Sequence, residues 1–351
     1  MRAIYATRGG GDDPLANLEI GERPVPDPPP GFARVRVTAS SLNRHDLWTL
    51  QGVTGEPITF PRILGCDVAG TVDAYGPQTP ETFPPGTPVV AHSLITCGRC
   101  EACLGPDETL CQHFAILSDG PYEGTLAEYT LVPAANLFLL PPQFTDAEAA
   151  CLPTAYLTAF RMLFGRARVR PGDTVLIQGA GGGVATAAEA IARLAGMRVI
   201  VTSRDATRRQ AALARGAHHA VETGRAAAGE ILGLTAGRGV DAVLETVGEA
   251  TWATSLRAVR PGGTIVVAGA TTGANPKADL ARIFWRQLTV MGSTMGSRAE
   301  FAALLRFAEV SGLTPMVDSV VPMDQAPAAF RRLAEGTALG KLVVRIAPQP
   351  R

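Results

Sequence analysis

The chain has 351 residues, which is enough for two domains and a sizeable core. Its 32 basic and 32 acidic residues balance, so its charge does not favour nucleic acid or an anionic membrane as a partner. No apolar run approaches the roughly 18 residues of a membrane span, and Met1–Gly11 lacks the apolar centre of a signal peptide. These features predict a compact, cytoplasmic α/β protein.

The N-terminal part of the chain reads mainly as strands and turns. Alternation of polar and apolar residues predicts a half-buried strand, and runs of apolar and small residues predict buried ones. The expected strands are Arg2–Ala6, Ala33–Ala39, Pro61–Val72 and Gly120–Pro133. Between the second and third, residues 40–47 open a short helix with Asp46 near its start. Thr145–Phe164 is expected to form a helical pair.

Four closely spaced cysteines form the strongest motif: Cys97, Cys100, Cys103 and Cys111. Four thiolates suit a tetrahedral zinc site with no open coordination position, and such closed sites are structural. One zinc ion per chain would hold a lobe of about residues 92–115, which has little core of its own. Disulfides or free thiols are the alternatives, and the missing secretory signal disfavours disulfides.

A β-α-β pattern follows at Thr174–Arg204. A strand at Val175–Ile177 runs into a glycine-rich turn, which is followed by a helix and a strand at Val199–Val201. Glycines let the backbone approach a pyrophosphate, and the helix N-terminus presents unpaired N–H groups to it. The predicted contacts are Ala180, Gly181, Gly182, Gly183 and Val184. A tight turn that binds no nucleotide is the alternative.

The end of the second strand indicates which dinucleotide binds. An NAD-binding unit usually has an acid there, which accepts hydrogen bonds from the adenosine ribose hydroxyls. Here the chain has Ser203, Arg204 and, one turn later, Arg208. A hydroxyl and guanidinium groups would bind a 2′-phosphate, so NADP(H) is predicted, although Asp205 keeps NAD(H) open.

Later strands complete a parallel sheet. Val240–Val247 and Gly263–Ala268 are expected to point their C-terminal ends at the cofactor, and Leu288–Gly292 to be the last, edge strand. A helix at Glu300–Glu309 and strands near Val317–Val321 and Lys341–Ile346 finish the fold.

These segments, in this order, resemble the medium-chain dehydrogenase/reductase superfamily over nearly the whole chain. The motifs that carry the resemblance are the Asn43–Asp46 helix start, Gly65–Gly70, the cysteine lobe, Gly124–Tyr129, the glycine turn and Pro261–Gly263. The resemblance implies a GroES-like, β-rich catalytic domain (1–150 and 296–351) interrupted by a Rossmann domain (151–295) with a doubly wound parallel sheet.

The departures from the family pattern concern catalytic zinc. In zinc alcohol dehydrogenases the catalytic ligands lie at the motif positions held here by Asn43, Cys66 and Thr154, with Asp67 replacing a neighbouring glutamate. Asparagine and neutral threonine are poor zinc ligands. A catalytic zinc would have to recruit His45, Asp67 or Cys151 from other positions.

Asn43, together with Leu157-Thr158-Ala159, resembles instead the quinone oxidoreductase and enoyl reductase branch, which transfers hydride from NADPH without a metal. The resemblance makes Asn43 the candidate for orienting the carboxamide or acceptor, and places Thr158 beside the nicotinamide. The other candidates are His45, Asp67 and Thr154 for catalysis and Val247, Gly269, Ala270 and Thr271 for the cofactor. A structural role for Asp46 and Asp67, either pairing with Arg345 or capping backbone N–H groups, is equally open.

Three hypotheses follow from these observations. The first is an NADPH-dependent reductase of quinones or α,β-unsaturated carbonyls with one structural zinc. The second is a zinc-dependent alcohol dehydrogenase with non-standard ligands, and the third is an NADPH-binding protein without turnover. The resemblance also implies a homodimer or homotetramer, paired through the edge strand near Val290.

Overall fold

The structure is a computed structural model that describes residues 1–53 and 58–346, and it divides into two compact units. Unit 1 comprises Met1–Ala155, Ser297–Glu309 and Thr314–Arg351. Unit 2 comprises Tyr156–Gly296 and Val310–Leu313. The boundaries between the units differ by a few residues from the expected ones. Residues 151–155, for example, belong to unit 1.

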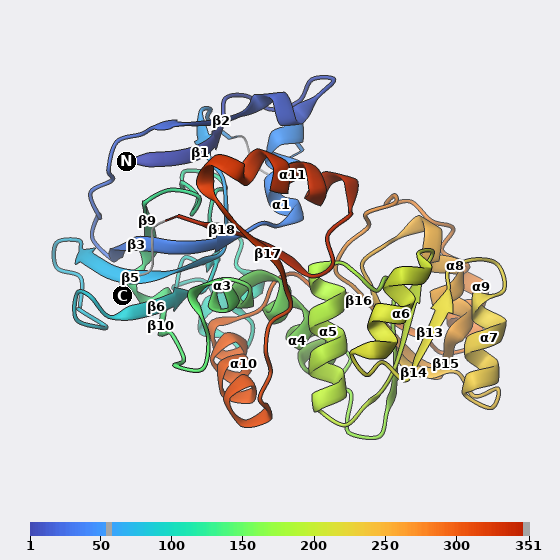
Figure 1. Cartoon of the computed structure of the whole chain (residues 1–351). Coiled ribbons are helices and arrows are strands. Elements are labelled where there is room, and N and C mark those ends of the chain that lie inside the picture. Colours follow the sequence, from blue (N-terminus) through green and yellow to red (C-terminus); the bar gives the residue numbers. More distant parts are fainter. Residues whose placement is uncertain (54–57, 347–351) are drawn as a thin grey trace. The chain divides into compact units, whose positions relative to one another are not determined.

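Unit 1 is built on a seven-stranded sheet of order β10-β6-β5-β3-β18-β17, with β9 also paired to β3 (Figure 1). Only β17 and β18 run parallel. The register pairs Val343 of β18 with Ser41 of β3, which brings the C-terminal strand beside residues 40–43. The strands are β3 (Phe32–Ser41), β5 (Val68–Tyr75), β6 (Pro88–Ala91), β9 (Tyr129–Pro133), β10 (Leu137–Leu139), β17 (Val317–Pro322) and β18 (Lys341–Arg345).

Smaller elements complete unit 1. A three-stranded sheet has the order β2-β1-β4, and β7 pairs with β8 at the neck of the cysteine lobe. These strands are β1 (Arg2–Ala6), β2 (Leu18–Glu22), β4 (Arg62–Ile63), β7 (Leu94–Ile95) and β8 (Ala115–Ile116). The helices are α1 (Arg44–Gln51), α2 (Glu101–Leu104), α3 (Asp146–Ala149), α10 (Arg298–Ser311) and α11 (Ala326–Glu335), with 3₁₀ turns η1 (Pro14–Asn17), η2 (Glu108–Leu110), η3 (Ala134–Asn136) and η6 (Met323–Gln325).

The expectation of one continuous strand over Pro61–Val72 is wrong. The chain turns between β4 and β5 at Gly65, whose φ of +94° favours glycine and whose Cβ would lie 2.5 Å from Thr125 Oγ1. Gly120–Pro133 is likewise strand only over β9, because Thr125 N and Leu126 N bond instead to the carbonyls of this turn. The turn places Cys66 and Asp67 at the site described below.

Unit 2 holds a fully parallel six-stranded sheet of order β13-β12-β11-β14-β15-β16. β16 is an edge strand, as predicted. The strands are β11 (Thr174–Ile177), β12 (Arg198–Ser203), β13 (His219–Glu222), β14 (Val240–Glu245), β15 (Val259–Val267) and β16 (Thr289–Gly292). The helices are α4 (Leu157–Phe160), α5 (Gly183–Leu194), α6 (Ala206–Ala214), α7 (Ala227–Leu234), α8 (Glu249–Ala258) and α9 (Leu280–Trp285), with a π-helical turn at Arg161–Arg166. A second π-helical turn, Leu152–Tyr156, belongs to unit 1 except for its last residue.

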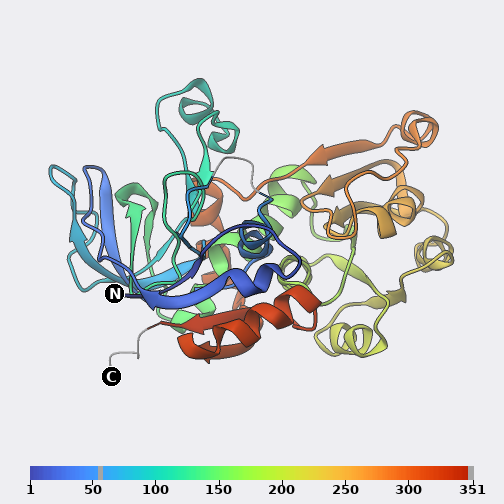
Figure 2. The same ribbon diagram turned by 90° about the horizontal axis from the view of Figure 1, so that it is seen from above.

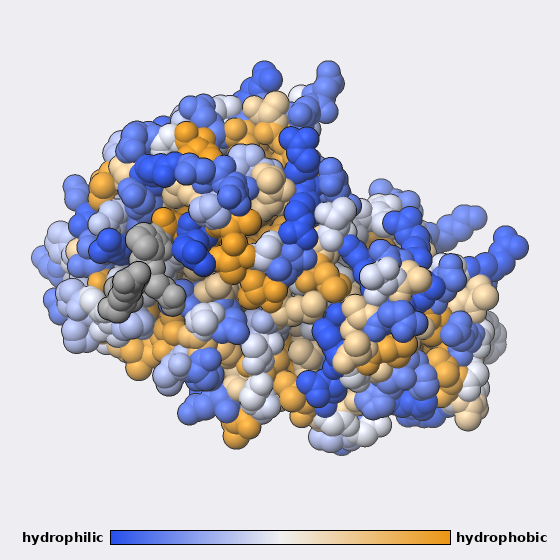
Figure 3. Space-filling view, viewed as in Figure 1, coloured by the Kyte–Doolittle hydropathy of each residue, from blue (hydrophilic) through white to orange (hydrophobic). Residues whose placement is uncertain are grey.

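Each unit has its own hydrophobic core. In unit 1, Leu50, Leu126 and Phe330 belong to one fully buried cluster, and Val35 and Val132 belong to another on the main sheet. In unit 2, Leu176, Ile200, Val243 and Ile265 of neighbouring parallel strands pack together. Hydrophilic and hydrophobic residues are interspersed on the surface seen in Figure 3. Within the described ranges, no helix has the length and apolar character needed to cross a bilayer.

Candidate active site and metal-binding lobe

The four cysteines come together in the lobe between β7 and β8, which projects from unit 1 (teal in Figure 2). Their Sγ atoms all lie within 4.8 Å of one another, with 3.5 Å between Cys100 and Cys103 and 3.9 Å between Cys97 and Cys103. Tetrahedral Zn–S bonds of about 2.3 Å require S–S separations of about 3.8 Å, so the residues fit a zinc ion. No other group of three or more His, Cys, Asp or Glu side chains in the described ranges could hold a metal.

Backbone amides also favour thiolates in this lobe. The N–H groups of Arg99 and Cys100 donate to Cys97 and lower the pKa of its thiol to about 6. Burial raises the pKa of Cys111 to about 11, although Cys97 N and His113 N donate to its sulfur at 3.5 and 3.3 Å. A cation shared by all four sulfurs would stabilise every one of them as a thiolate.

A partly buried ion pair ties the lobe to α10. The Arg298 guanidinium donates to both carboxylate oxygens of Glu108, at 2.9 Å and 3.1 Å to Oε2, and Arg298 N donates to Oε1 at 2.7 Å. Burial opposes ionisation, but these hydrogen bonds lower the pKa of Glu108. The lobe is therefore fixed at its neck and at this ion pair.

In unit 2, the glycine-rich turn joins β11 to α5 as the sequence predicts. Gly179 has φ +90°, and α5 begins after Gly182 without a side-chain cap. Helix N–H groups at the start of α5 therefore have no capping oxygen. Val184 is the second residue of that helix, and Ala180 is buried.

The residues after β12 divide into two roles. Asp205 caps α6, because its carboxylate accepts hydrogen bonds from Thr207 N at 2.7 Å and Arg208 N at 3.2 Å. Ser203 is buried at the strand end, whereas Arg204 is exposed. Asp205, the acidic residue that left NAD(H) possible, is thus engaged in capping α6.

Arg208 lies against the glycine-rich turn. A Cβ built on Gly181 would lie 2.8 Å from Arg208 Nη1 and 2.9 Å from its Cζ. The structure therefore brings together Gly181 and Arg208, which the sequence proposed for different parts of the dinucleotide.

A buried chain of hydrogen bonds, which the sequence did not reveal, supports this end of the sheet. Thr202 Oγ1 donates to Gln178 Oε1 at 2.6 Å, and Gln178 Nε2 donates to Ser255 Oγ at 2.9 Å. Ser255 in turn donates to Glu245 at 2.6 Å, and Glu245 also accepts from Val247 N at 2.8 Å. The chain links the C-terminal ends of β11, β12 and β14.

The remaining predicted cofactor contacts also lie in unit 2. Val247 follows β14, and residues 269–271 follow β15. The two loops are joined by hydrogen bonds, from Thr272 N to Val247 O at 2.8 Å and from Thr271 N to Thr246 O at 3.4 Å. Thr158 is buried in α4.

In unit 1, the predicted catalytic positions form one buried polar network. Asn43 Nδ2 lies 2.7 Å from Asp67 Oδ2 and 3.4 Å from Cys66 Sγ. Thr154 Oγ1 donates to Asp67 Oδ1 at 2.6 Å and lies 3.5 Å from Cys66 Sγ. Ser41 donates to Asp67 Oδ2 at 2.6 Å. The Asp67 carboxylate is the common acceptor at the centre of this network.

Lys341, which the sequence placed only at the start of a strand, completes the network. Its Nζ donates to Asn43 Oδ1 at 2.5 Å and to Leu42 O at 2.7 Å, and lies 3.6 Å from Asp67 Oδ2. The side chains of Lys341 and Asp67 are 3% and 0% exposed. The expected pairing of Asp67 with Arg345 is wrong, because Arg345 is exposed and the buried ammonium is that of Lys341.

Asparagine and threonine are poor zinc ligands, and both side chains at the catalytic-zinc positions have their oxygens engaged in this network. Asn43 Oδ1 already accepts from an ammonium, and the Thr154 hydroxyl already donates to Asp67. Burial, followed by the charges of Asp67 and Asp46, raises the pKa of the Cys66 thiol well above its ordinary value. The Lys341 ammonium, 3.6 Å from Asp67 Oδ2, would also repel a cation bound beside this carboxylate.

His45 lies in the first turn of α1, beside this network. Its Nε2 is 3.1 Å from Ser118 Oγ and 3.3 Å from Asp119 Oδ1. The neighbouring Asp46 carboxylate does not contact the His45 ring in this way; it accepts hydrogen bonds from Asn43 N and Gly65 N, both at 2.8 Å. Burial lowers the pKa of His45, but the hydrogen bond and charge of Asp119 and the charges of Asp46 and Asp67 outweigh it, so the pKa is raised.

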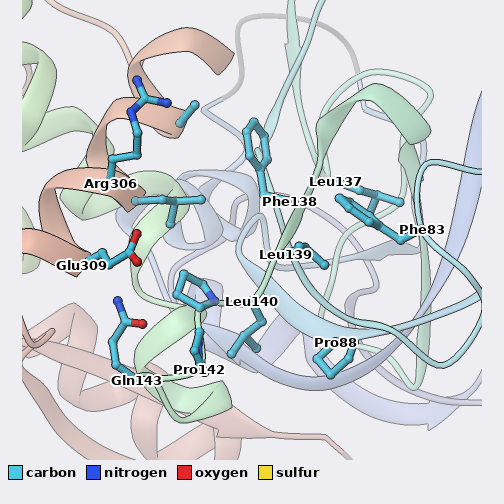
Figure 4. A pocket seen from close by; sticks show the side chains of 13 residues that line it. Phe83, Pro88, Leu137, Phe138, Leu139, Leu140, Pro142, Gln143, Arg306 and Glu309 are labelled. Carbon is cyan, nitrogen blue, oxygen red and sulfur yellow. The ribbon is translucent and has the colours of Figure 1, made fainter.

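A separate, shallow cavity of about 520 Å³ lies between α10 and the segment around β10 (Figure 4). Phe83, Phe138 and Leu139 form its apolar side, with Arg306 and Glu309 opposite. None of the predicted catalytic, cofactor or metal positions lines it.

The comparisons with known proteins agree with this architecture. Residues 29–142 match the alcohol dehydrogenase GroES-like domain, and residues 183–310 match the zinc-binding dehydrogenase domain. A zinc-type alcohol dehydrogenase-like protein of Schizosaccharomyces pombe is 31% identical over 90% of this chain and 91% of its own. A quinone oxidoreductase of Mus musculus is 26% identical over 98% of this chain and 97% of its own.

Two solved structures are also close. One, described as an NAD-dependent alcohol dehydrogenase, has a TM-score of 0.93 and 39% identity, and covers 99% of this chain and 100% of its own. The other is a 2-octenoyl-CoA carboxylase reductase in complex with NADP and 2-octenoyl-CoA. It has a TM-score of 0.90 and 26% identity, and covers 99% of this chain and 88% of its own. The chain belongs to the medium-chain dehydrogenase/reductase superfamily of nicotinamide-dependent oxidoreductases.

Proposed function

We propose that the chain is an NADPH-dependent reductase of quinones or α,β-unsaturated carbonyls that works without a catalytic metal and carries one structural zinc. The observation that carries this proposal is the closed network of Asn43, Cys66, Asp67, Thr154 and Lys341. Each oxygen that could bind zinc is already engaged within it. The similarity to a quinone oxidoreductase and to a carboxylase reductase supports the same reaction class.

In this proposal bound NADPH supplies the hydride, and the chain supplies positioning and electrostatics. Lys341 and Asp67 hold the Asn43 amide from opposite ends, so its orientation is fixed. Thr154 is partly exposed, and its hydroxyl donates a hydrogen bond to Asp67, which leaves its oxygen lone pairs as acceptors. These groups would orient the nicotinamide carboxamide or the acceptor.

Metal content and substrate range together test the reaction class. We expect one zinc per purified chain, NADPH oxidation by 3-penten-2-one or a benzoquinone, and negligible oxidation of primary or secondary alcohols. Elemental analysis and absorbance at 340 nm measure these outcomes. Two zinc ions per chain with alcohol oxidation would establish the zinc alcohol dehydrogenase instead, and tight NADPH binding without any turnover would establish a binding protein.

We infer the phosphorylated dinucleotide from Ser203, Arg204 and Arg208, since Asp205 is engaged as the α6 cap. Replacing Arg204 or Arg208 by alanine should weaken NADPH about tenfold to a hundredfold, because a charge-assisted pair is lost, and NADH less than twofold. Fluorescence titration measures both affinities, and Arg225→Ala, an exposed arginine of the same unit, is the control. Equal weakening of both dinucleotides would contradict the assignment.

We also propose a homodimer or homotetramer paired through β16. Among the described strands, β15 is the one that pairs with this edge strand, and Val290 is 40% exposed. Nearby on α9, Leu280, Phe284 and Trp285 are 61–77% exposed. Val290→Pro removes an N–H from this edge and is expected to yield monomers by analytical ultracentrifugation.

A further inference from the structure

Reduction of a conjugated carbonyl needs a proton as well as a hydride. When the β-carbon accepts a hydride, the carbon–carbon double bond is lost and the electron pair moves to an enolate. One proton must then reach that enolate to give the saturated carbonyl. The proposed function, on which this inference depends, does not say which group supplies it.

The buried network leaves few donors for this proton. The Thr154 hydroxyl donates its hydrogen bond to Asp67, and the Lys341 ammonium points at Asn43, Leu42 and Asp67. Cys66 is 0% exposed. The polar hydrogens of Thr154 and Lys341 are thus used in hydrogen bonds inside the network, and the buried thiol of Cys66 is out of reach of a substrate.

His45 is different, because only one of its two ring nitrogens is engaged. Its Nε2 faces Asp119 and Ser118, while its Nδ1 has no hydrogen-bond partner among residues 1–53 and 58–346. A ring held at one nitrogen by a carboxylate is oriented to exchange a proton at the other. His45 retains 13% side-chain exposure, so Nδ1 is not sealed inside the core.

The segment that contacts His45, residues 117–119, is held in a fixed conformation. Ser118 is fully buried with φ +78°, a left-handed conformation that is unfavourable for serine and is kept by its surroundings. Leu117 N bonds to Ser93 O at 3.0 Å, and the Ser93 hydroxyl bonds to Cys66 O at 2.5 Å. The segment that carries Asp119 is therefore tied to the same network as Cys66.

We propose that His45, positioned by Asp119 and Ser118, is the proton donor that completes reduction of the substrate. The imidazolium gives the Nδ1 proton to the enolate, remains hydrogen-bonded to Asp119 through Nε2–H, and is reprotonated by water. NADPH is oxidised and the carbonyl compound gains two electrons and two hydrogens. Asp119 is a positioning residue, and its charge keeps the ring protonated.

The carboxylates that face His45 come from three segments: Asp119 after β8, Asp46 on α1, and Asp67 before β5. They raise the pKa of His45 despite its burial, so the ring stays protonated above its ordinary pKa of 6.5. The rate kcat/KM should therefore be level at low pH and fall as pH rises through the raised pKa.

The test is the pH profile of kcat/KM for NADPH and 3-penten-2-one. Asp119→Asn should move the fall to lower pH, and His45→Gln should remove it and reduce kcat/KM about 10²-fold. Asp12→Asn, an exposed charge change elsewhere in unit 1, should leave the profile unchanged. Thermal unfolding and NADPH affinity check that each variant is folded.

A proton NMR titration, practical because the chain has only five histidines, should show the pKa of His45 falling in Asp119→Asn. If His45→Gln keeps the wild-type rate and profile, or if the pKa of His45 is unmoved by Asp119→Asn, the proton-donor assignment is wrong while the reductase stands. If the wild-type protein reduces no quinone or enone, the proposed function itself fails.

Discussion

The charge of Lys341 determines the electrostatics of the site in unit 1. The chain has two lysines among its 32 basic residues, and the other, Lys277, is exposed. The buried Lys341 ammonium balances the buried Asp67 carboxylate, and its charge also acts to lower the pKa of Asp46 and Cys66. An ammonium fits here because it is compact and has three donors to share among nearby acceptors.

At this scale we predict that Lys341→Met lowers the free energy of unfolding by about 3–5 kcal/mol, because it leaves the Asp67 charge buried and unpaired. The double variant Asp67→Asn/Lys341→Met should recover much of that loss. Urea unfolding of the wild type, both single variants and the double variant forms the cycle. A double variant no more stable than Lys341→Met would show that the pair does not balance charge.

The cysteine lobe has little apolar core of its own. Its helix α2 has four residues, and Leu104 and Leu110 are 77% and 68% exposed, so apolar burial contributes little there. The neck strands β7 and β8 have two residues each. The four thiolates and the Glu108–Arg298 pair must supply the order that a core would otherwise give.

We therefore predict that removing zinc unfolds this lobe locally. After treatment with a strong chelator, or in Cys103→Ser, a protease should cleave within residues 97–111, while the main sheet of unit 1 keeps its circular dichroism signal. Cys151→Ser, which changes a buried thiol outside the lobe, is the control. Equal protease resistance with and without zinc would refute this role.

The whole molecule consists of two units with separate cores, and unit 2 contains its own acid-sensitive anchor. Asp241 on β14 accepts hydrogen bonds from Arg238 at 2.5 Å and Arg260 at 2.7 Å, and from Thr174 N at 2.9 Å. Burial opposes ionisation, but these partners outweigh it and lower the pKa of Asp241 to about 2.

A carboxyl whose pKa is lowered by folding stabilises the protein above its ordinary pKa, here 3.8, and this stabilisation is lost as pH falls towards about 2. Asp241→Asn should therefore be less stable than wild type at pH 7, by about 1–3 kcal/mol. The difference should shrink between pH 4 and pH 2. Unfolding by urea at several pH values measures it, and a difference independent of pH would contradict the assignment.

Local patterns in the sequence were sufficient for the elements whose residues are neighbours along the chain. Cysteines three residues apart converge in a short lobe wherever it lies, and a strand, glycine turn and helix follow one another directly. The break at Gly65 was missed because a run of apolar and small residues does not report a left-handed turn.

The tertiary structure alone decided which distant side chains meet. Lys341 is 298 residues from Asn43. His45 meets Asp119 because the neck strand β8 brings the following segment beside α1. Pairing of β18 with β3 brings that ammonium to Asp67, and no spacing rule encodes it. The sequence by itself determined the family, the fold class and the cysteine lobe. The position of the Lys341 ammonium beside Asp67, and that of the His45 ring beside Asp119, depend on long-range packing.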